Sequence, residues 1–322
     1  MLRVHLTFDV EVWCPGWGHL DETFPTAFER YVWGRSAAGN YGLPRNLDIL
    51  RQHGLRAVFF VEPLFSLRFG QRYLQTIVDL IMDAGQEVQL HLHPEWVDEI
   101  QPPLIPNTAS KRQHLTDYDL PEQVALLSQA KAALEVAAGR PVSAFRSGGY
   151  AVNRQTYAAL SVAGISVDSS LNATFDRTAG SLGANHSLLQ RRVIDGIDVH
   201  PVTVFRDGRG RLRHLQVGAC GFQEMRQVLD CAWVAGLSDV VLVSHNFELL
   251  KPGGAQPDRI VERRFDALCG HLARHTDRFQ VVGFDGLAPA AAAPAGARPG
   301  LLAAGMLATG LRLGAQALRR VL

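Results

Sequence analysis

The stretch LRVHLTFDVE, residues 2–11, decides the first step of the fold because it reads as an apolar strand with acidic residues at its end. Side chains two positions apart on a strand point to the same face of the sheet. Asp9 and Glu11 therefore present two carboxylates side by side where this strand leaves the core.

A second stretch, EVQLHLHP at residues 87–94, repeats the pattern with histidines. His91 and His93 share one face of their strand in the same way. Carboxylates and imidazoles are the ligands of a hydrolytic zinc or a similar divalent metal. The two pairs together predict a metal site built from two distant parts of the chain.

Other short β-branched or aromatic runs predict further strands, and amphipathic stretches that stop at glycine predict helices between them. Repeated strand, helix and glycine indicate an α/β fold with mostly parallel strands. Seven or so such units favour a distorted or incomplete (β/α) barrel over an open sheet. The predicted strands are 2–9, 56–62, 87–92, 142–145, 165–168, 197–205, 239–244 and 279–284, and the predicted helices are 43–53, 73–84, 120–138 and 155–163.

The composition is that of a globular protein, with 322 residues, 47% hydrophobic and 20% charged. A formal net charge of +1 does not show the excess of basic residues that is typical of nucleic-acid-binding proteins. The four cysteines lack paired short spacings, which is typical of free thiols in a reducing compartment. The chain enters a strand directly after Met1, without a charged leader and an apolar signal region, so we expect a cytoplasmic protein.

Three parts depart from the strand and helix rhythm. Residues 12–42 are a long excursion rich in aromatic residues and glycine, whose rings could either face a sugar or pack on one another. Residues 288–300 form an Ala/Pro/Gly linker after a domain that spans 1–287. Residues 301–322 are an amphipathic segment that could lie on the inner face of a membrane or dock on the domain or a partner.

Three more motifs also fall where predicted strands end, and barrel enzymes keep their active sites at that end of the strands. They are FRSGGY at 145–150, VDSS at 167–170 and LVSHN at 242–246. With the acidic and histidine pairs, these motifs place the candidate site residues at one edge of the sheet.

The ordered motifs resemble those of the polysaccharide deacetylase (NodB homology) family over roughly residues 1–287. Thr7-Phe8-Asp9 is similar to the family's T-F-D-D, and the histidine pair before Pro94 is similar to its second motif. Arg146 to Tyr150, Asp168, and Leu242 with His245 follow in the family's order. The resemblance implies a cytoplasmic-type member with an incomplete (β/α) barrel and a divalent metal, zinc being the first choice.

Two departures from the family pattern affect the metal site. One residue separates His91 from His93, where the family usually has three. Val10 stands where the family has its metal-binding second aspartate, so that role passes to Glu11 or to Asp9. We favour Glu11 as the ligand and Asp9 as the base, and the reverse assignment stays open.

The resemblance also implies roles for the remaining candidates. Glu11, His91 and His93 would hold the metal. Asp9, oriented by Arg146, would be the general base, and His245, its imidazolium favoured by Asp168, would be the general acid. Substrate contacts would come from Gly148, Gly149, Tyr150 and Trp96, with the Tyr150 N–H as an oxyanion donor. Arg146 with Asp168 could also be an ordinary ion pair, and the two glycines could serve only a tight turn.

The expected function is the removal of N-acetyl groups from an amino sugar of a glycoconjugate or (exo)polysaccharide precursor. A metal-dependent amidase or cyclic-amide hydrolase acting on a small nitrogenous substrate is an alternative. A saccharide-binding homologue with little turnover is another, motivated by the lost tandem aspartate. The expected partner is a saccharide and not a nucleic acid, and the sequence leaves the oligomeric state open.

Overall fold

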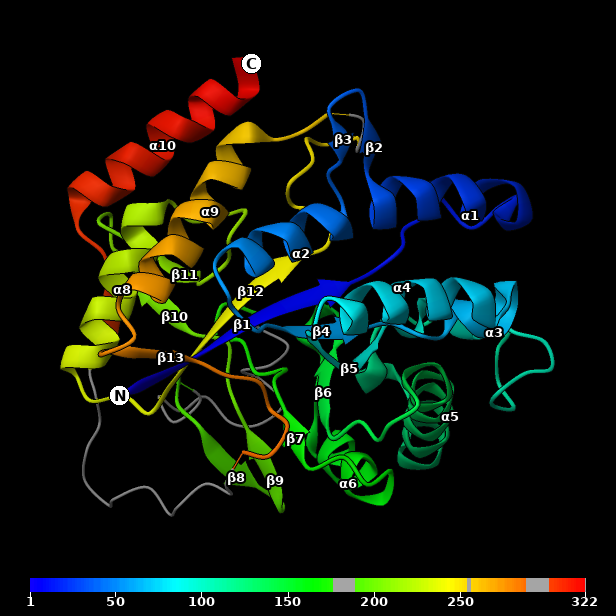
Figure 1. Ribbon diagram of the computed structural model, residues 1–322. Coiled ribbons are helices and arrows are strands. Elements are labelled where there is room, and N and C mark those ends of the chain that lie inside the picture. The colour runs from blue at the N-terminus through cyan, green and yellow to red at the C-terminus, as the bar shows by residue number, and fades with distance from the viewer. Residues whose placement is uncertain (176–188, 254–255, 288–300, 322) are drawn as a thin grey trace. The chain divides into compact units, whose positions relative to one another are not determined.

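The structure is a computed structural model that describes residues 1–175, 189–253, 256–287 and 301–321 (Figure 1). The chain forms two compact units. Unit 1 consists of residues 1–57, 203–282 and 298–322, and unit 2 of residues 58–202 and 283–297. The predicted linker 288–300 lies outside the described residues.

The centre of unit 1 is strand β1 (Leu2–Val10), which pairs in parallel with β12 (Asp239–His245) and with β13 (Phe279–Val281). Nearly every residue of β1 is buried, as expected for a parallel strand covered on both faces. Helix α9 (Arg259–Arg274) contributes Phe265, whose ring lies edge-on to Phe8 with 5.6 Å between ring centroids.

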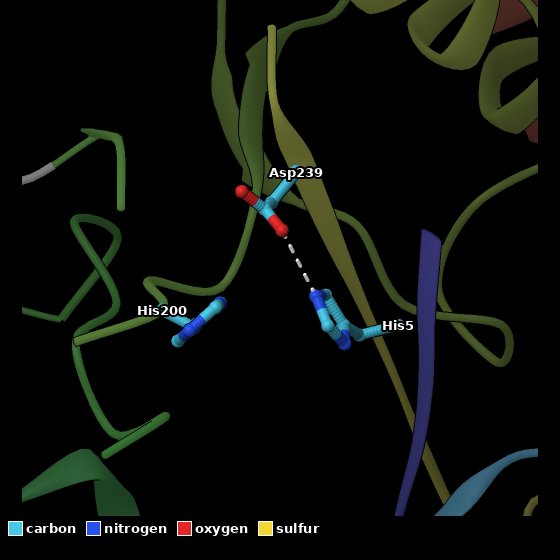
Figure 2. A group of neighbouring side chains, drawn as sticks. All are labelled: His5, His200 and Asp239. Carbon is cyan, nitrogen blue, oxygen red and sulfur yellow. Dashed lines mark hydrogen bonds and ion pairs between the residues drawn. The ribbon is translucent and has the colours of Figure 1, made fainter. Parts of the chain in front are cut away.

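An ion pair joins the amino-terminal ends of β1 and β12. Arg3 donates two hydrogen bonds to the Asp239 carboxylate, at 2.7 and 2.9 Å. His5 Nε2 lies 3.2 Å from the same carboxylate (Figure 2). The strand pairing sets Arg3 opposite Asp239, and the same register sets Asp9 opposite His245 at the other end.

The excursion at 12–42 has structure of its own. It contains α1 (Leu20–Phe28), a π-helical turn (Glu29–Trp33) and the short strands β2 (Arg35–Ser36) and β3 (Gly39–Asn40), and α2 (Leu43–Gln52) follows. Phe24 and Phe28 are buried and pack on each other with 6.3 Å between ring centroids. Of the two alternatives for the aromatic residues of this excursion, packing on one another is confirmed for Phe24 and Phe28.

The rest of unit 1 comes from the second half of the chain. Strands β10 (Val204–Arg206) and β11 (Leu212–His214) are antiparallel, and β14 (Leu302–Ala303) adds to β10 in parallel. Helix α8 (Phe222–Val234) precedes β12, and α10 (Met306–Val321) ends the described chain. The sequence analysis did not predict α8 or α9.

Helix α10 packs on α8 through polar side chains rather than through leucines. Arg312 donates to Glu224 at 3.0 Å and to Asp207 at 3.0 Å, and Thr309 Oγ1 donates to Glu224 at 2.9 Å. All four of these side chains are buried, whereas Leu307 and Leu311 are exposed. The predicted amphipathic segment therefore contacts its own unit, and contact with a membrane stays a prediction. Among the described residues, no helix combines the length and the apolarity that crossing a membrane requires.

Unit 2 is a run of parallel strands joined by helices. The strands β4 (Val58–Val61), β5 (Glu87–Leu92), β6 (Ala144–Ser147), β7 (Val167–Asp168) and β9 (Ile197–Val199) pair in that order, and β8 (Arg192–Ile194) is antiparallel to β9. The helices are α3 (Phe65–Phe69), α4 (Gln71–Asp83), α5 (Leu120–Ala138) and α6 (Arg154–Val162), with 3₁₀ turns at Pro94–Glu99, Leu115–Asp117 and Gly148–Tyr150.

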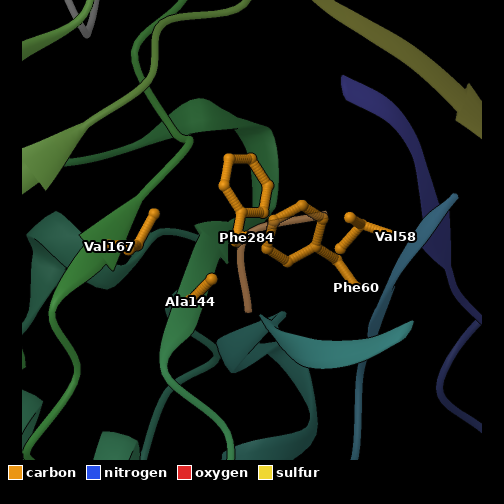
Figure 3. Packing of buried hydrophobic residues seen from close by; sticks show 5 residues of the cluster. All are labelled: Val58, Phe60, Ala144, Val167 and Phe284. Atoms are coloured by element: carbon orange, nitrogen blue, oxygen red, sulfur yellow. The ribbon is translucent and has the colours of Figure 1, made fainter. Parts of the chain in front are cut away.

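The core of unit 2 contains side chains from several strands. Val58, Phe60, Ala144 and Val167 pack with Phe284, which comes from a distant part of the chain (Figure 3). The rings of Phe60 and Phe284 lie 5.8 Å apart. Because these strands are short, this packing supplies cohesion that strand length alone does not give.

One predicted strand is wrong. Residues 197–205 were expected to form one strand, and the structure breaks them into β9 in unit 2 and β10 in unit 1. Pro201 lies between the two pieces and has no backbone N–H to donate to a ladder, which explains the break.

We predict that Arg312→Met loosens α10, because it leaves the Asp207 and Glu224 carboxylates buried without their cation. The free energy of unfolding should fall by about 3 kcal/mol, as when one partner of a buried ion pair is removed. Urea denaturation measures this change, with the exposed Arg209→Met as the matched control. Equal stability of the two variants would contradict the packing described here.

Candidate active site

Three polar side chains of unit 1 gather where β1 and β12 end. Asp9 stands opposite His245 in the strand register, and Glu11 follows β1 directly. Asp9, Glu11 and His245 each offer a ligand atom, and these atoms lie within 4.8 Å of one another. Both carboxylates are buried. This spacing suits a shared cation or a proton exchanged between base and acid.

Asn246 holds the backbone of Glu11 in place beyond the end of the strand. Its side chain accepts from the Glu11 N–H at 3.1 Å and donates to the Glu11 carbonyl at 3.3 Å. Asn246 also donates from its own backbone N–H to the carbonyl of Asp9 at 3.2 Å. The Glu11 side chain accepts from the Trp13 indole at 2.7 Å. Both acidic residues are thus positioned by main-chain contacts with the residue after His245.

Glu248 is the carboxylate that contacts His245 within unit 1. Its Oε1 lies 2.8 Å from His245 Nδ1. Gly218 N–H donates to the other carboxylate oxygen at 2.6 Å, and the Ser244 hydroxyl donates to it at 3.1 Å. A carboxylate held this firmly keeps a proton of His245 on Nδ1.

The surroundings of His245 favour its charged form. Burial alone would lower the pKa of His245, but the hydrogen bond that the ring donates to Glu248 and the charges of Glu11, Glu248 and Asp9 outweigh it and raise that pKa to about 9. A histidine with this pKa carries a proton at neutral pH, which is what a general acid requires.

The histidine pair belongs to unit 2 and has the hydrogen bonds typical of metal ligands. His91 Nδ1 lies 2.7 Å from the Arg146 carbonyl, so it donates its proton there. His93 Nδ1 lies 3.2 Å from Glu95 Oε2. The two rings are 4.8 Å apart. With Nδ1 protonated, the lone pair of each ring is on Nε2, the arrangement that carbonyl or carboxylate partners give to metal-binding histidines.

The double glycine has a steric reason. A Cβ on Gly148 would lie 2.6 Å from the His93 ring, closer than real contacts allow. Gly149 has φ +60° and Tyr150 has φ +56°, both in the left-handed region. The backbone after β6 is thus shaped around His93, and Tyr150 is held in a strained conformation of the kind found at functional sites.

Trp96 is only 2% exposed and packs edge-on against Phe65 and Phe69, at 6.5 and 5.8 Å between ring centroids. The sequence analysis proposed it as a substrate contact. Its burial favours a packing role instead, because a sugar could reach little of the ring.

Arg146 and Asp168 lie in the interior of unit 2, both fully buried. Arg146 donates to the Ser169 carbonyl at 3.0 Å and to the Ser169 hydroxyl at 2.9 Å. Burial raises the pKa of Asp168 to about 6, although hydrogen bonds from Ser170 and the charge of Arg146 act in the opposite direction. The predicted partnerships of Arg146 with Asp9 and of Asp168 with His245 stay predictions.

Two acidic residues of these units were not among the residues to which the sequence analysis gave a catalytic or metal-binding role. The sequence analysis gave Glu248 no catalytic role, although its place three residues after His245 is a usable signal. Glu62 follows the last residue of β4. Burial raises the pKa of Glu62 to about 8, although the charge of the nearby His93 acts in the opposite direction. Its position at a strand end was visible in the sequence, but an isolated acidic residue carries little information there.

Comparisons with known proteins bear on the fold. No family model matches the chain, and no curated protein matches its sequence. Among solved structures, it is similar to a protein from Mycobacterium smegmatis provisionally assigned as a polysaccharide deacetylase. That similarity has a TM-score of 0.50 and 16% identity, over 99% of this chain and 91% of the other.

Two further structures are more distant. A family 4 carbohydrate esterase from Streptomyces lividans has a TM-score of 0.40 and 15% identity, covering 87% of this chain and 91% of its own. A CE4 family pseudoenzyme from Bacillus anthracis has a TM-score of 0.41 and 14% identity, covering 86% and 62%.

The similarity to the Mycobacterium smegmatis protein shows the fold. The chain has an incomplete (β/α) barrel fold like that protein's, with mostly parallel strands and helices between them. The fold class predicted from the sequence is thereby confirmed.

We predict that Glu248→Gln lowers the pKa of His245 from about 9 toward or below the ordinary value of 6.5, because it removes a charge in direct contact with the ring. Titration of the His245 ring by NMR in metal-free protein measures the change. Glu262→Gln, which alters another buried glutamate of unit 1, is the control and should leave this pKa unchanged.

The same pKa gives stability a pH dependence with a definite sign. In the folded protein the pKa of His245 is about 9, whereas in the unfolded chain it has the ordinary value of 6.5. The stabilisation from charged His245 is therefore complete below pH 6.5 and is lost as the pH rises to about 9. Glu248→Gln should therefore lose less stability than wild type between these pH values. Thermal denaturation at a series of pH values measures this loss of stability. An equal loss in the wild type and in Glu248→Gln would contradict the raised pKa of His245.

We also predict that Gly148→Ala displaces the His93 ring while the fold is kept, because the new methyl group would overlap it. Zinc affinity should fall at least tenfold, as for other losses of ligand positioning. Equilibrium dialysis measures the affinity and circular dichroism the fold. Gly314→Ala, at a position with open space around it, is the control.

Proposed function

We propose that this protein is a metal-dependent hydrolase that removes N-acetyl groups from an amino sugar of a glycoconjugate or (exo)polysaccharide precursor. The observation that carries the proposal is the grouping of Asp9, Glu11 and His245 at the carboxyl ends of paired parallel strands. Two carboxylates and a histidine with a raised pKa supply a base and an acid for breaking an amide bond.

The proposed metal ligands are Glu11, His91 and His93. The donor types fit a divalent cation such as zinc, and the Nδ1 hydrogen bonds of both histidines support their assignment. A bound ion of this kind supplies Lewis-acid polarisation of the acetyl carbonyl and of a water molecule.

The chain's own residues would then manage the protons. Asp9, oriented by Arg146, would accept a proton from the attacking water. His245 would donate its proton to the departing amine, and Glu248 would hold the ring so that Nε2 faces the substrate. The backbone at Gly148 and Gly149 admits close approach, and the Tyr150 N–H would donate to the developing oxyanion.

The proposed substrate is a saccharide, without nucleic acid as a partner. A cytoplasmic protein would act on a precursor rather than on a finished wall polymer. The exposed Leu307, Leu311 and Leu318 of α10 would suit peripheral contact with the inner face of a membrane, where lipid-linked saccharides lie.

The test measures acetate release from a panel of N-acetylhexosamine conjugates by purified protein with added zinc. His91→Ala and His93→Ala should each lose metal and at least about 99% of turnover. Each variant lacks one proposed ligand, so it would lose the cation that polarises the carbonyl and the water. The exposed His19→Ala is the control. Metal content by elemental analysis accompanies every assay.

Each negative result has a meaning. Metal binding without acetate release from any sugar would overturn the deacetylase proposal and favour hydrolysis of a small cyclic amide. Saccharide binding with no metal and no turnover would favour a binding protein. Unchanged metal content and turnover in both histidine variants would remove the proposed site.

Asp9→Asn and Glu11→Gln separate the base from the ligand. If Glu11 is the ligand, Glu11→Gln loses metal, whereas Asp9→Asn keeps metal and loses turnover by a factor of about 10²–10⁴. The opposite pattern would reverse the two assignments.

A further inference from the structure

The exposed face of helix α10 is apolar. Up to residue 318, its exposed positions hold Met306, Leu307, Leu311 and Leu318, and otherwise only glycine and alanine. Met306 and Leu307 are 76% and 78% exposed. These positions recur at intervals of three and four, so they lie on one side of the helix. The helix therefore presents a row of large apolar side chains without any charge among them.

The β10–β11 hairpin lies beside the first turn of α10. Strand β10 pairs in parallel with β14, which directly precedes the helix. The Gly208 N–H in the turn of the hairpin donates to Thr309 Oγ1 at 2.9 Å. A Cβ on Gly208 would lie only 2.4 Å from the Cα of Met306. The turn of the hairpin is thus in contact with the exposed end of the apolar row.

The hairpin and α10 together form a basic region. Arg206, Arg209 and Arg211 of the hairpin are exposed, whereas its one acidic residue, Asp207, is buried and paired with Arg312. Residues 301–322 contain three arginines and no aspartate or glutamate. Because the whole chain has a net charge of only +1, this concentration of arginines is local.

We propose that unit 1 docks on a membrane that contains anionic lipid. The docking surface consists of Met306, Leu307 and Leu311 of α10 and Arg206, Arg209 and Arg211 of the hairpin. Apolar side chains of an interfacial helix enter the boundary between headgroups and acyl chains, and arginines beside it attract acidic headgroups. This extends the membrane contact in the proposed function to a second element and to a class of lipid, and it does not depend on the hydrolase chemistry.

Charge disfavours a second copy of the chain as the occupant of this surface. A two-fold interface is built from the same patch on both subunits. The hairpin arginines would then meet no exposed acidic side chain of residues 204–214 or 301–322. Complementary charge is what steers and orients specific partners, and an anionic bilayer supplies it together with an apolar interior.

The experiment is sedimentation of the full chain with vesicles of phosphatidylcholine, either alone or with about 30% phosphatidylglycerol. At low salt, we expect binding to the anionic vesicles to be at least about tenfold tighter than to the neutral ones, because each arginine near an anionic surface contributes to binding. Raising NaCl from about 50 to about 500 mM should reduce this preference, because salt shortens the range of the attraction.

One pair of variants tests the basic part of the docking surface. Arg209→Gln combined with Arg211→Gln should weaken binding to the anionic vesicles at least about tenfold. Arg72→Gln combined with Arg154→Gln is the matched control, since it removes two exposed arginines of unit 2, and it should bind as the wild type does.

A second pair tests the apolar part. Leu307→Ser combined with Leu311→Ser should also weaken binding at least about tenfold, because two leucine side chains no longer enter the acyl boundary. Val136→Ser combined with Val162→Ser, which alters two exposed apolar residues on helices of unit 2, is the control. Circular dichroism verifies that each variant keeps its fold.

The proposal is overturned if the chain does not sediment with anionic vesicles at low salt, or if it binds neutral vesicles equally well. Unchanged binding in either docking-surface variant would overturn it too. A stable dimer, measured by light scattering, that Leu307→Ser with Leu311→Ser dissociates would show a second copy on this surface instead. Sedimentation requires neither metal nor acetate release, so failure of the proposed hydrolase activity and failure of this surface give separate results.

Discussion

The parallel pairing of β1 with β12 is the constraint on which the candidate site of unit 1 depends. The register sets Asp9 opposite His245, and Asn246 then bonds both main-chain groups of Glu11 beyond the last residue of β1. A shift of one residue would turn every side chain of β1 to the other face. The Arg3–Asp239 ion pair at the opposite ends of the strands opposes such a shift. The positions of the proposed base, the proposed acid and one proposed metal ligand thus follow from a single ladder.

Burial acts differently on the ionisable groups because their partners differ. Burial raises the pKa of Asp168 to about 6 and of Glu62 to about 8, and the hydrogen bonds they accept only partly compensate. His245 is also buried, but the direct contact with Glu248 overcomes desolvation and raises its pKa to about 9. Glu62 and His245 can therefore hold protons at neutral pH, whereas Asp168 is mostly ionised there.

Helix α10 inverts the usual arrangement of an amphipathic helix. Thr309 and Arg312 face α8 and are buried, while Leu307 and Leu311 are exposed. The polar side chains find partners because Glu224 and Asp207 are buried beneath them.

The sequence by itself determined the fold class and most strand positions, because alternating and continuous apolar runs report burial directly. It also determined the paired polar side chains at positions 9 and 11 and at 91 and 93, since period two on a strand is a local property. The break at Pro201 was readable but was missed, and α8 and α9 were not predicted. Only the tertiary structure showed that Glu248 partners His245, that His93 needs Gly148 to lack a side chain, and that Trp96 is buried in the core. These facts depend on contacts between segments, and the chemical type of a residue does not encode which distant atom it meets.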